Sequence, residues 1–342
     1  MIFSSRTVDL DAYLAKVADR EAEMLHWATN WRSDLLARVI NGAEVEGDKL
    51  PWSKTHSSVR LRPGELSIWA GINGHRKSML LGQVMLWLAR ERRICIASLE
   101  MKPAETLFRM ATQAHGGELD VDTAAHFVEG CNGRICLYDQ LDTVEADRIL
   151  GMVHYAANEL GCQHIVIDSL TKCGISGDDY GKQKRFVDRL QWAAKSYEVH
   201  IHLVAHMRKG KDESDRPGKF DIRGASEITD LADNVFITWK DKAREEAQYL
   251  RSTGGNLTPE HIRALDRPDQ ILDVAKQRHG EFEGRFSLWF HARSLQFLGS
   301  DEGRALPWPD YEGNMANWKP CPTYGDHYRR LAAASNPAHS AH

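Results

Sequence analysis

The chain has 342 residues, a formal net charge of −4 and a 42% share of hydrophobic residues. At roughly 150 residues per domain, this length allows about two domains, or one large α/β domain with arms. The acidic balance excludes a broadly basic surface, so any nucleic-acid site must be local. No apolar stretch approaches the ~20 residues of a membrane span, and the N-terminus lacks an apolar signal core. We therefore expect a cytoplasmic protein without a membrane partner, in which the six cysteines are reduced.

The first 60 residues read as a helical arm followed by a linker. Residues 6–40 predict a helix, because apolar residues recur at three- and four-residue steps. Asn41 and Gly42 are typical of a helix end, and the polar stretch that follows, up to Arg60, predicts a linker. Such a helix packs either on its own domain or on a neighbouring subunit. The apolar residues of the stripe are Leu10, Leu14, Val17, Leu25, Ala28, Trp31, Leu35 and Val39.

Between residues 61 and 298 short apolar runs alternate with helical stretches. This pattern predicts an α/β fold with a mostly parallel sheet covered on both faces, ending in a hairpin. The expected strands are Leu66–Ala70, Ile94–Leu99, Arg134–Tyr138, His164–Asp168, His200–Ala205, Asn234–Trp239, Ile271–Ala275 and Phe286–Phe290. The expected helices are 77–92, 103–115, 143–161 and 182–197. The tail, 299–342, holds five of the eleven prolines and is expected to be extended or disordered.

The strongest motif follows the first expected strand and opens a helix. A phosphate-binding loop needs inward-pointing backbone N–H groups, a lysine for the β- and γ-phosphates and a hydroxyl for Mg²⁺. The segment fits G-x-x-x-x-G-K-[ST] except that Arg76 replaces the second glycine. An arginine side chain there either crowds the phosphate or adds a positive charge to it. The expected nucleotide-binding residues are Gly71, Asn73, Gly74, His75, Arg76, Lys77 and Ser78.

Two acidic residues follow later apolar strands. Asp168 ends the run His164–Asp168, where an aspartate of a phosphate-loop enzyme holds Mg²⁺. Glu100 follows the run Ile94–Leu99. Carboxyl ends of neighbouring parallel strands meet at one edge, so the two acids divide naturally into a metal holder and a water activator.

These segments together resemble the DnaB-like hexameric helicases, which have a RecA-type core and include phage replicative helicases and Twinkle. The resemblance spans roughly residues 60–298, in the motif order of that family. It implies a RecA-like P-loop NTPase core. The further segments that carry it are Ser98-Leu99-Glu100-Met101-Lys102-Pro103, Val204-Ala205-His206-Met207-Arg208-Lys209, Phe220–Ser226, Leu231–Val235 and Lys276-Gln277-Arg278.

The resemblance implies a role for each matching residue. Lys77 and Ser78 would bind phosphate and Mg²⁺, Asp168 would hold the metal, and Glu100 would be the general base. His206 would sense the γ-phosphate and couple it to the loop that follows.

A second set of residues would act between subunits. Arg278, with Lys276, would enter the neighbouring site as an arginine finger, which requires a ring or filament. The family's arm helix packs on the adjacent subunit, which favours that placement for residues 6–40. Besides Arg76, the chain departs from the family at Asp230, where many relatives have a glutamine facing the phosphate.

Contact with DNA is expected from loops. The cations Arg208, Lys209 and Lys211 follow the sensor strand, with Lys219, Arg223 and Gly224 further along. Such a loop can follow a phosphate backbone without reading bases. A second pore loop is expected in Thr171–Gly181, and the segment 241–268 reads as an insertion without an assigned role.

Two other patterns carry less weight. His200, His202 and His206 alternate on one strand face like metal ligands, but a buried strand beside a phosphate site accounts for them better than zinc. The ten tryptophans are attributed to core and tail packing rather than to base stacking.

The sequence thus predicts an NTP-driven ring helicase that moves on single-stranded DNA during replication, encoded by a phage or similar replicon. It would use ATP or another NTP with Mg²⁺, assemble as a hexamer in the host cytoplasm and depend on a separate primase and polymerase. The alternatives are a RecA-type strand-exchange or loading ATPase, and a weakly catalytic or non-catalytic ring that binds single-stranded DNA.

Overall fold

The computed structural model describes residues 25–40, 47–176, 178–207, 216–222, 228–301 and 305. The chain divides into two units, residues 1–46 and 47–342. In the first, a 3₁₀ turn, Ala28–Trp31, leads into α2, Arg32–Ile40. The prediction of one continuous helix over 6–40 is wrong at residues 25–27, which are not helical. Apolar periodicity predicts which face of a segment is apolar, and it does not show that the backbone is helical at every residue. Residues 6–24 lie outside the described residues.

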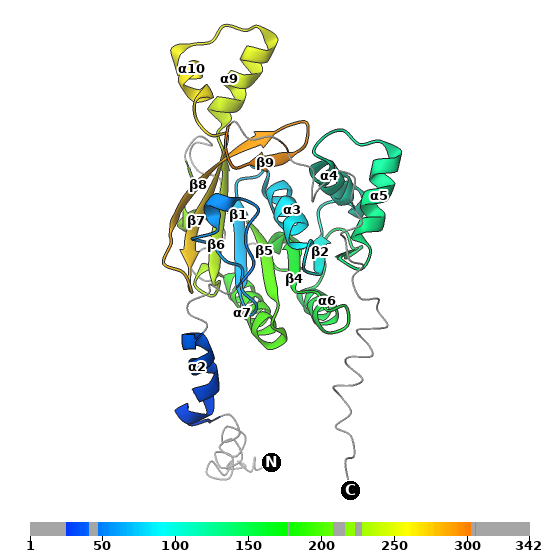
Figure 1. Ribbon diagram of the computed structural model, residues 1–342, viewed down its shortest axis with the longest axis vertical. Helices are drawn as coiled ribbons and strands as arrows, with labels where there is room; N and C mark the ends of the chain where they lie inside the picture. Colours follow the sequence, from blue (N-terminus) through cyan, green and yellow to red (C-terminus); the bar gives the residue numbers. More distant parts are fainter. Residues whose placement is uncertain are drawn as a thin grey trace, which may run out of the picture. The chain divides into compact units, whose positions relative to one another are not determined.

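One nine-stranded sheet organises the described part of the second unit (Figure 1). The strand order is β3-β2-β4-β5-β1-β6-β7-β8-β9, parallel from β3 to β6 and antiparallel from β6 onward. All eight expected strands are present, whereas β9 was not expected. The strands are β1 Leu66–Gly71, β2 Ile94–Ser98, β3 Ile135–Leu137, β4 His164–Asp168, β5 His200–His206, β6 Asn234–Lys240, β7 Gln270–Gln277, β8 Gly284–His291 and β9 Gln296–Leu298.

Helices cover both faces of the sheet, as predicted. Leu66, Ile68 and Ala70 of β1 face the core that includes α6 and α7, while Trp69 faces the core that includes α3, α4 and α5. The alternation of β1 side chains therefore feeds two hydrophobic cores. The helices are α3 Lys77–Leu88, α4 Pro103–His115, α5 Val121–Cys131, α6 Ala146–Asn158, α7 Tyr180–Tyr197, α9 Lys242–Thr253 and α10 Pro259–Leu265. No helix in the described ranges is both long and apolar enough to cross a membrane.

The segment before β1 is part of this unit and not a linker. Leu50, Trp52 and Val59 are buried in the core beside α3, and the Trp52 indole N–H donates to the Phe297 carbonyl oxygen at 2.7 Å. The predicted boundary at residue 60 is therefore wrong, and the unit begins at Gly47. The polar composition of this stretch concealed a few large apolar side chains that the core buries.

Of the helices with bounds given above, α5, α9 and α10 were not predicted. Each starts at a side-chain cap that the sequence contains. Asp120 accepts from the Thr123 N–H, Asp241 from the Arg244 N–H, and Thr258 from the His261 N–H. Such capping residues were a usable signal that the apolar pattern alone did not provide.

Three histidines lie buried at the amino-terminal ends of β4 and β5. His164 lies between the Asp48 carboxylate, at 3.0 Å, and the His202 ring, also at 3.0 Å. His200 contacts the Ser67 hydroxyl at 2.7 Å. Burial lowers the pKa of all three histidines, that of His200 to about 3. These contacts place His200 and His202 in the core, as the sequence indicated.

We expect this cluster to make folding sensitive to mild acid. A histidine whose folded-state pKa is depressed binds more protons when unfolded, so its contribution is lost as the pH falls below about 6.5. Between pH 7 and 5.5 the protonation of His200 in the unfolded chain should lower the free energy of unfolding by roughly 1 kcal/mol, and His164 and His202 act in the same direction. Denaturant unfolding at both pH values checks this, and His200→Gln should show the smaller drop. An equal drop in the variant would contradict the assignment to His200.

Candidate nucleotide-binding site

The predicted site residues converge at the carboxyl edge of four adjacent strands. Gly71 ends β1 and pairs with His206 at the end of β5, while Ser98 of β2 pairs with Asp168 of β4. Glu100 follows β2 by two residues. The phosphate loop, both carboxylates and the predicted sensor histidine are therefore neighbours, as expected of residues at one edge of a parallel sheet.

The phosphate loop links β1 to α3. Gly74 has φ +82°, a left-handed backbone conformation that favours glycine. A Cβ built on it would meet nothing within 4 Å, so the backbone conformation, and not a lack of space, accounts for a glycine at this position. At Gly71 a Cβ would lie 2.6 Å from the Thr238 carbonyl oxygen, which excludes any larger residue. Asn73 and Gly74 are exposed. The loop thus offers an accessible tip on a tightly packed base.

Lys77 is buried at the first position of α3. Its Nζ donates to the carbonyl oxygens of Gly71, at 2.8 Å, and Ile72, at 3.1 Å. Burial lowers its pKa, and the carboxylates of Asp168 and Glu100 oppose that shift. In this arrangement the ammonium group occupies the interior of the loop, where a phosphate would compete with two neutral carbonyl groups for it.

Arg76 neither crowds the loop interior nor points into it. Its backbone adopts the left-handed conformation, with φ 61°, that a glycine would take at this position. The guanidinium group lies over the Phe290 ring, 3.9 Å from its centroid, and 3.5 Å from a carboxylate oxygen of Glu245 on α9. The arginine that replaces the second motif glycine is therefore accommodated by contacts with β8 and α9.

His75 anchors the loop to β6. Its ring is fully buried and its Nδ1 accepts from the Lys240 N–H at 3.0 Å. Burial, with the nearby cations of Lys242 and Lys240, lowers its pKa to about 4. The ring is therefore neutral at ordinary pH and holds the loop in place. Only the backbone of His75 is available to contact a phosphate.

Glu100 is held by two neighbouring side chains. Its Oε1 accepts from the Ser169 hydroxyl at 2.6 Å and lies 3.3 Å from His206 Nε2. The contact with His206, followed by that with Ser169, lowers the pKa of Glu100 to about 2 against the opposing effect of burial. Ser169 also contacts the Thr171 hydroxyl at 2.7 Å. Ser169 was not among the predicted site residues, although a hydroxyl directly after Asp168 was a signal.

Asp168 and Ser78 form the candidate metal position. Asp168 is buried and burial raises its pKa, while a hydrogen bond from Ser78 works in the opposite direction. A carboxylate and a hydroxyl side by side present the oxygen donors that Mg²⁺ prefers. In the described residues no group of three or more His, Cys, Asp or Glu side chains could hold a metal ion by itself. The remaining ligands would have to come from nucleotide and water.

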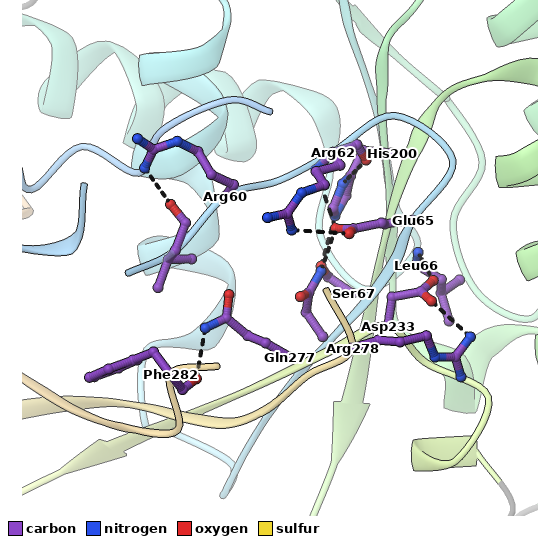
Figure 2. A network of polar contacts seen from close by, with 12 residues as sticks. Arg60, Arg62, Glu65, Leu66, Ser67, His200, Asp233, Gln277, Arg278 and Phe282 are labelled. Atoms are coloured by element: carbon purple, nitrogen blue, oxygen red, sulfur yellow. Dashed lines mark hydrogen bonds and ion pairs between the residues drawn. The ribbon is translucent and has the colours of Figure 1, made fainter. Parts of the chain in front are cut away.

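Arg278 and Lys276 lie at the opposite, amino-terminal edge of the sheet, where β7 ends beside the start of β6. Figure 2 shows Arg278 beside Asp233. The Arg278 guanidinium pairs with buried Asp233 at 2.9 Å, and Asp233 also accepts from the Leu66 N–H at 2.9 Å. Lys276 Nζ donates to the carbonyl oxygens of Thr229 and Asp230. The structure therefore does not bring either cation into the phosphate site of its own chain.

Most of the expected DNA-contacting residues are not described. Arg208, Lys209, Lys211, Arg223 and Gly224 lie outside the described residues. The expected second loop begins with a 3₁₀ turn, Leu170–Lys172, directly after β4, and α7 starts at Tyr180. Lys219 lies in a further 3₁₀ turn, Lys219–Asp221.

The sheet order and this edge are those of a RecA-like fold, with the phosphate loop, Asp168 and Glu100 at neighbouring strand ends. The AAA domain family model matches residues 39–212, half of the chain. The chain belongs to this AAA domain family, and nucleotide binding follows from that membership.

Solved structures share the fold. The chain matches one solved ATPase domain with a TM-score of 0.66 and 14% identity, over 81% of this chain and 100% of that one. It matches a DnaB-like replicative helicase, solved to show its interactions with primase, with a TM-score of 0.61 and 13% identity, over 80% of this chain and 67% of that one. The core therefore has the fold of DnaB-like helicase ATPase domains, which confirms the predicted fold class.

A curated relative matches part of the chain. The DNA helicase/primase of Enterobacteria phage T3 is 31% identical over 109 residues. The match covers 29% of this chain and 19% of the phage protein. The matched region is thus about a fifth of the length of that relative.

Proposed function

We propose that the protein is an NTP-hydrolysing, ring-shaped DNA helicase that moves along single-stranded DNA during phage replication. The observation that carries the proposal is the division of the site between two edges of one sheet. Glu100, Asp168 and the phosphate loop meet at the carboxyl edge, whereas Arg278 lies at the amino edge. A finger at the far edge can complete only the site of another subunit, which calls for a ring or a filament.

Nucleotide binding would use the residues of the carboxyl edge. The backbone N–H groups of the loop from Asn73 to Lys77 would cradle the phosphates at the start of α3, where the helix dipole favours negative charge. Lys77 Nζ would exchange the carbonyls of Gly71 and Ile72 for the β- and γ-phosphates. Ser78 and Asp168 would hold Mg²⁺, which when bound neutralises charge on the phosphates.

Hydrolysis would depend on Glu100. An ionised carboxylate at this edge can accept a proton from a water aligned with the γ-phosphate. In the described arrangement Ser169 and His206 both contact one oxygen of that carboxylate, Oε1, so the water would bind either at Oε2 or in exchange for one of these contacts. His206 precedes the segment with Arg208 and Lys209, so the same exchange would connect phosphate sensing to DNA contact.

The partners follow from the same proposal. Single-stranded DNA would pass through a hexamer, contacted by Arg208, Lys209 and Lys211 and by Arg223 and Gly224. The apolar side chains of the arm, including Trp27, Trp31 and Leu35, are exposed and would pack on the adjacent subunit. A primase acting with the ring would be a separate protein.

The proposal is tested by hydrolysis and unwinding. Wild-type protein should hydrolyse ATP or another NTP faster when single-stranded DNA is added, and should unwind a forked duplex. Lys77→Ala should lower nucleotide affinity about 100-fold, because a desolvated charge-assisted phosphate contact contributes roughly 3 kcal/mol. Titration of a labelled nucleotide measures this loss.

The outcomes separate the alternatives. Hydrolysis no faster in wild type than in Lys77→Ala would contradict an NTPase. DNA-stimulated hydrolysis with filaments in place of closed rings, and without unwinding, would favour the strand-exchange or loading ATPase.

A further inference from the structure

A group of cations surrounds the base of the phosphate loop. The side chains of Lys77, Arg76, Lys240 and Lys242 are all close enough to depress the pKa of the buried His75 ring. Arg76 and Lys240 are themselves largely buried, with 18% and 13% of their side-chain surface exposed. Positive charge is thus concentrated beneath the loop at which the proposed function puts a triphosphate.

One anion on the inserted α9–α10 hairpin neutralises two of these cations. Glu245, in the first turn of α9, places one carboxylate oxygen 2.5 Å from Lys240 Nζ and the other 3.5 Å from the Arg76 guanidinium. The Arg76 guanidinium is in addition stacked on Phe290. Because Arg76 directly precedes Lys77, Glu245 is connected to the loop through a single residue.

The rest of the hairpin is fixed independently of Glu245. Buried Arg244 donates to the carbonyl oxygens of Leu265 and Arg267 and lies 3.7 Å from Asp269. Arg267 pairs with Asp241 at 3.1 Å. Figure 1 shows α9 and α10 extending past the end of β6. The hairpin can therefore keep its own fold when the contact through Glu245 breaks.

We propose that Glu245 acts as a competing anion for the phosphate loop, so that a bound triphosphate displaces it and loosens the α9–α10 hairpin from the nucleotide site. The reason is electrostatic. A triphosphate carries several negative charges and attracts Arg76 and Lys240 more strongly than a single carboxylate that is half exposed to water. The inference rests on the proposed function, because it requires a nucleotide at this loop. The α9–α10 hairpin would then change its contact with the loop according to whether a nucleotide is bound.

Nucleotide affinity gives the first test. Glu245→Gln removes the competing charge and keeps the side-chain shape, so it should bind adenosine 5′-(β,γ-imido)triphosphate two- to fivefold more tightly, measured by displacement of a fluorescent ADP. The gain should shrink at high salt, where partly exposed charges are screened. In an Arg76→Gln background the same substitution should change affinity by less than it does in wild type. Glu246→Gln, at the next and also exposed position, is the matched control and should change affinity less than twofold.

Amide hydrogen exchange of the full chain gives the second test. The non-hydrolysable triphosphate should speed exchange in residues 242–253 of the wild type and of Glu246→Gln, and Glu245→Gln should show faster exchange before nucleotide is added. Unchanged or weaker binding by Glu245→Gln, or exchange in α9 that does not respond to bound nucleotide, would overturn the inference while leaving the proposed function intact. Absence of nucleotide binding by wild type, with no difference from Lys77→Ala, would overturn both.

Discussion

Arg278→Ala should lower NTP hydrolysis by about 10³-fold or more and leave nucleotide affinity nearly unchanged. A trans-acting arginine finger acts mainly on the charge of the transition state, and removing such a finger costs 10³–10⁵ in rate. In the free chain the guanidinium is paired with Asp233 at the amino edge of the sheet, so the phosphate loop of the same chain does not depend on it. Steady-state hydrolysis and nucleotide titration measure the two quantities separately.

A less stable fold is the competing explanation for lost hydrolysis in Arg278→Ala. Asp233 is only 1% exposed, and the substitution would remove its charged partner. Arg278→Lys keeps a cation beside Asp233 but lacks the forked guanidinium, so it should preserve stability and still lose most of the hydrolysis. Arg285→Ala, which removes a more exposed arginine that pairs with Asp273, is the control and should retain activity.

Mixing two inactive variants gives the sharpest test of a shared site. A subunit with Arg278→Ala has an intact phosphate loop, and a subunit with Lys77→Ala has an intact finger. Mixed rings therefore contain complete sites, and hydrolysis should reappear when the two variants are combined. Parallel loss of nucleotide affinity and hydrolysis in Arg278→Ala, or no recovery on mixing, would contradict the finger assignment.

Glu100→Gln should lower hydrolysis by about 10²–10⁴-fold, the usual contribution of a general base, without weakening nucleotide binding. The amide still accepts hydrogen bonds from Ser169 and His206 but cannot take a proton from water. Single-turnover hydrolysis with bound nucleotide isolates this step. Retention of the wild-type rate would remove Glu100 from the chemistry, and Glu105→Gln on α4 is the exposed control.

The pH profile adds a second readout for Glu100. Because its pKa is lowered to about 2, the carboxylate is ionised at every pH above about 4. Protonation of Glu100 should therefore not reduce hydrolysis between pH 5 and 8. Any fall in rate at the acidic end of that range must come from another group.

Much of the site could be predicted because parallel-sheet topology fixes where strand ends lie. Once Gly71, Glu100, Asp168 and His206 are each placed at the end of an apolar run, the alternation with helices brings them to one edge. The structure confirms this convergence. The strands were predicted well for the same reason, because buried parallel strands are continuous apolar runs.

Other features depend on contacts between distant segments. The stretch from Gly47 to Arg60 looks like a linker in composition, but Leu50, Trp52 and Val59 find a core that only the folded chain creates. Ser169 gains importance only because β2 and β5 bring Glu100 and His206 to it.

The sequence by itself determined the fold class, the phosphate loop and the two carboxylates, since these follow from local periodicity and from motifs whose chemistry is contained in neighbouring residues. Tertiary structure alone decided where Arg76 points, that Glu245 shares it with Lys240, and that Arg278 is paired with Asp233 away from its own site. The physical reason is that a long charged side chain takes its direction from the partners around it, and those partners can be far away in the chain, as Glu245 is from Arg76, at a separation of 169 residues. The net charge of −4 likewise says nothing of the cations gathered at the phosphate loop, because only folding brings them together.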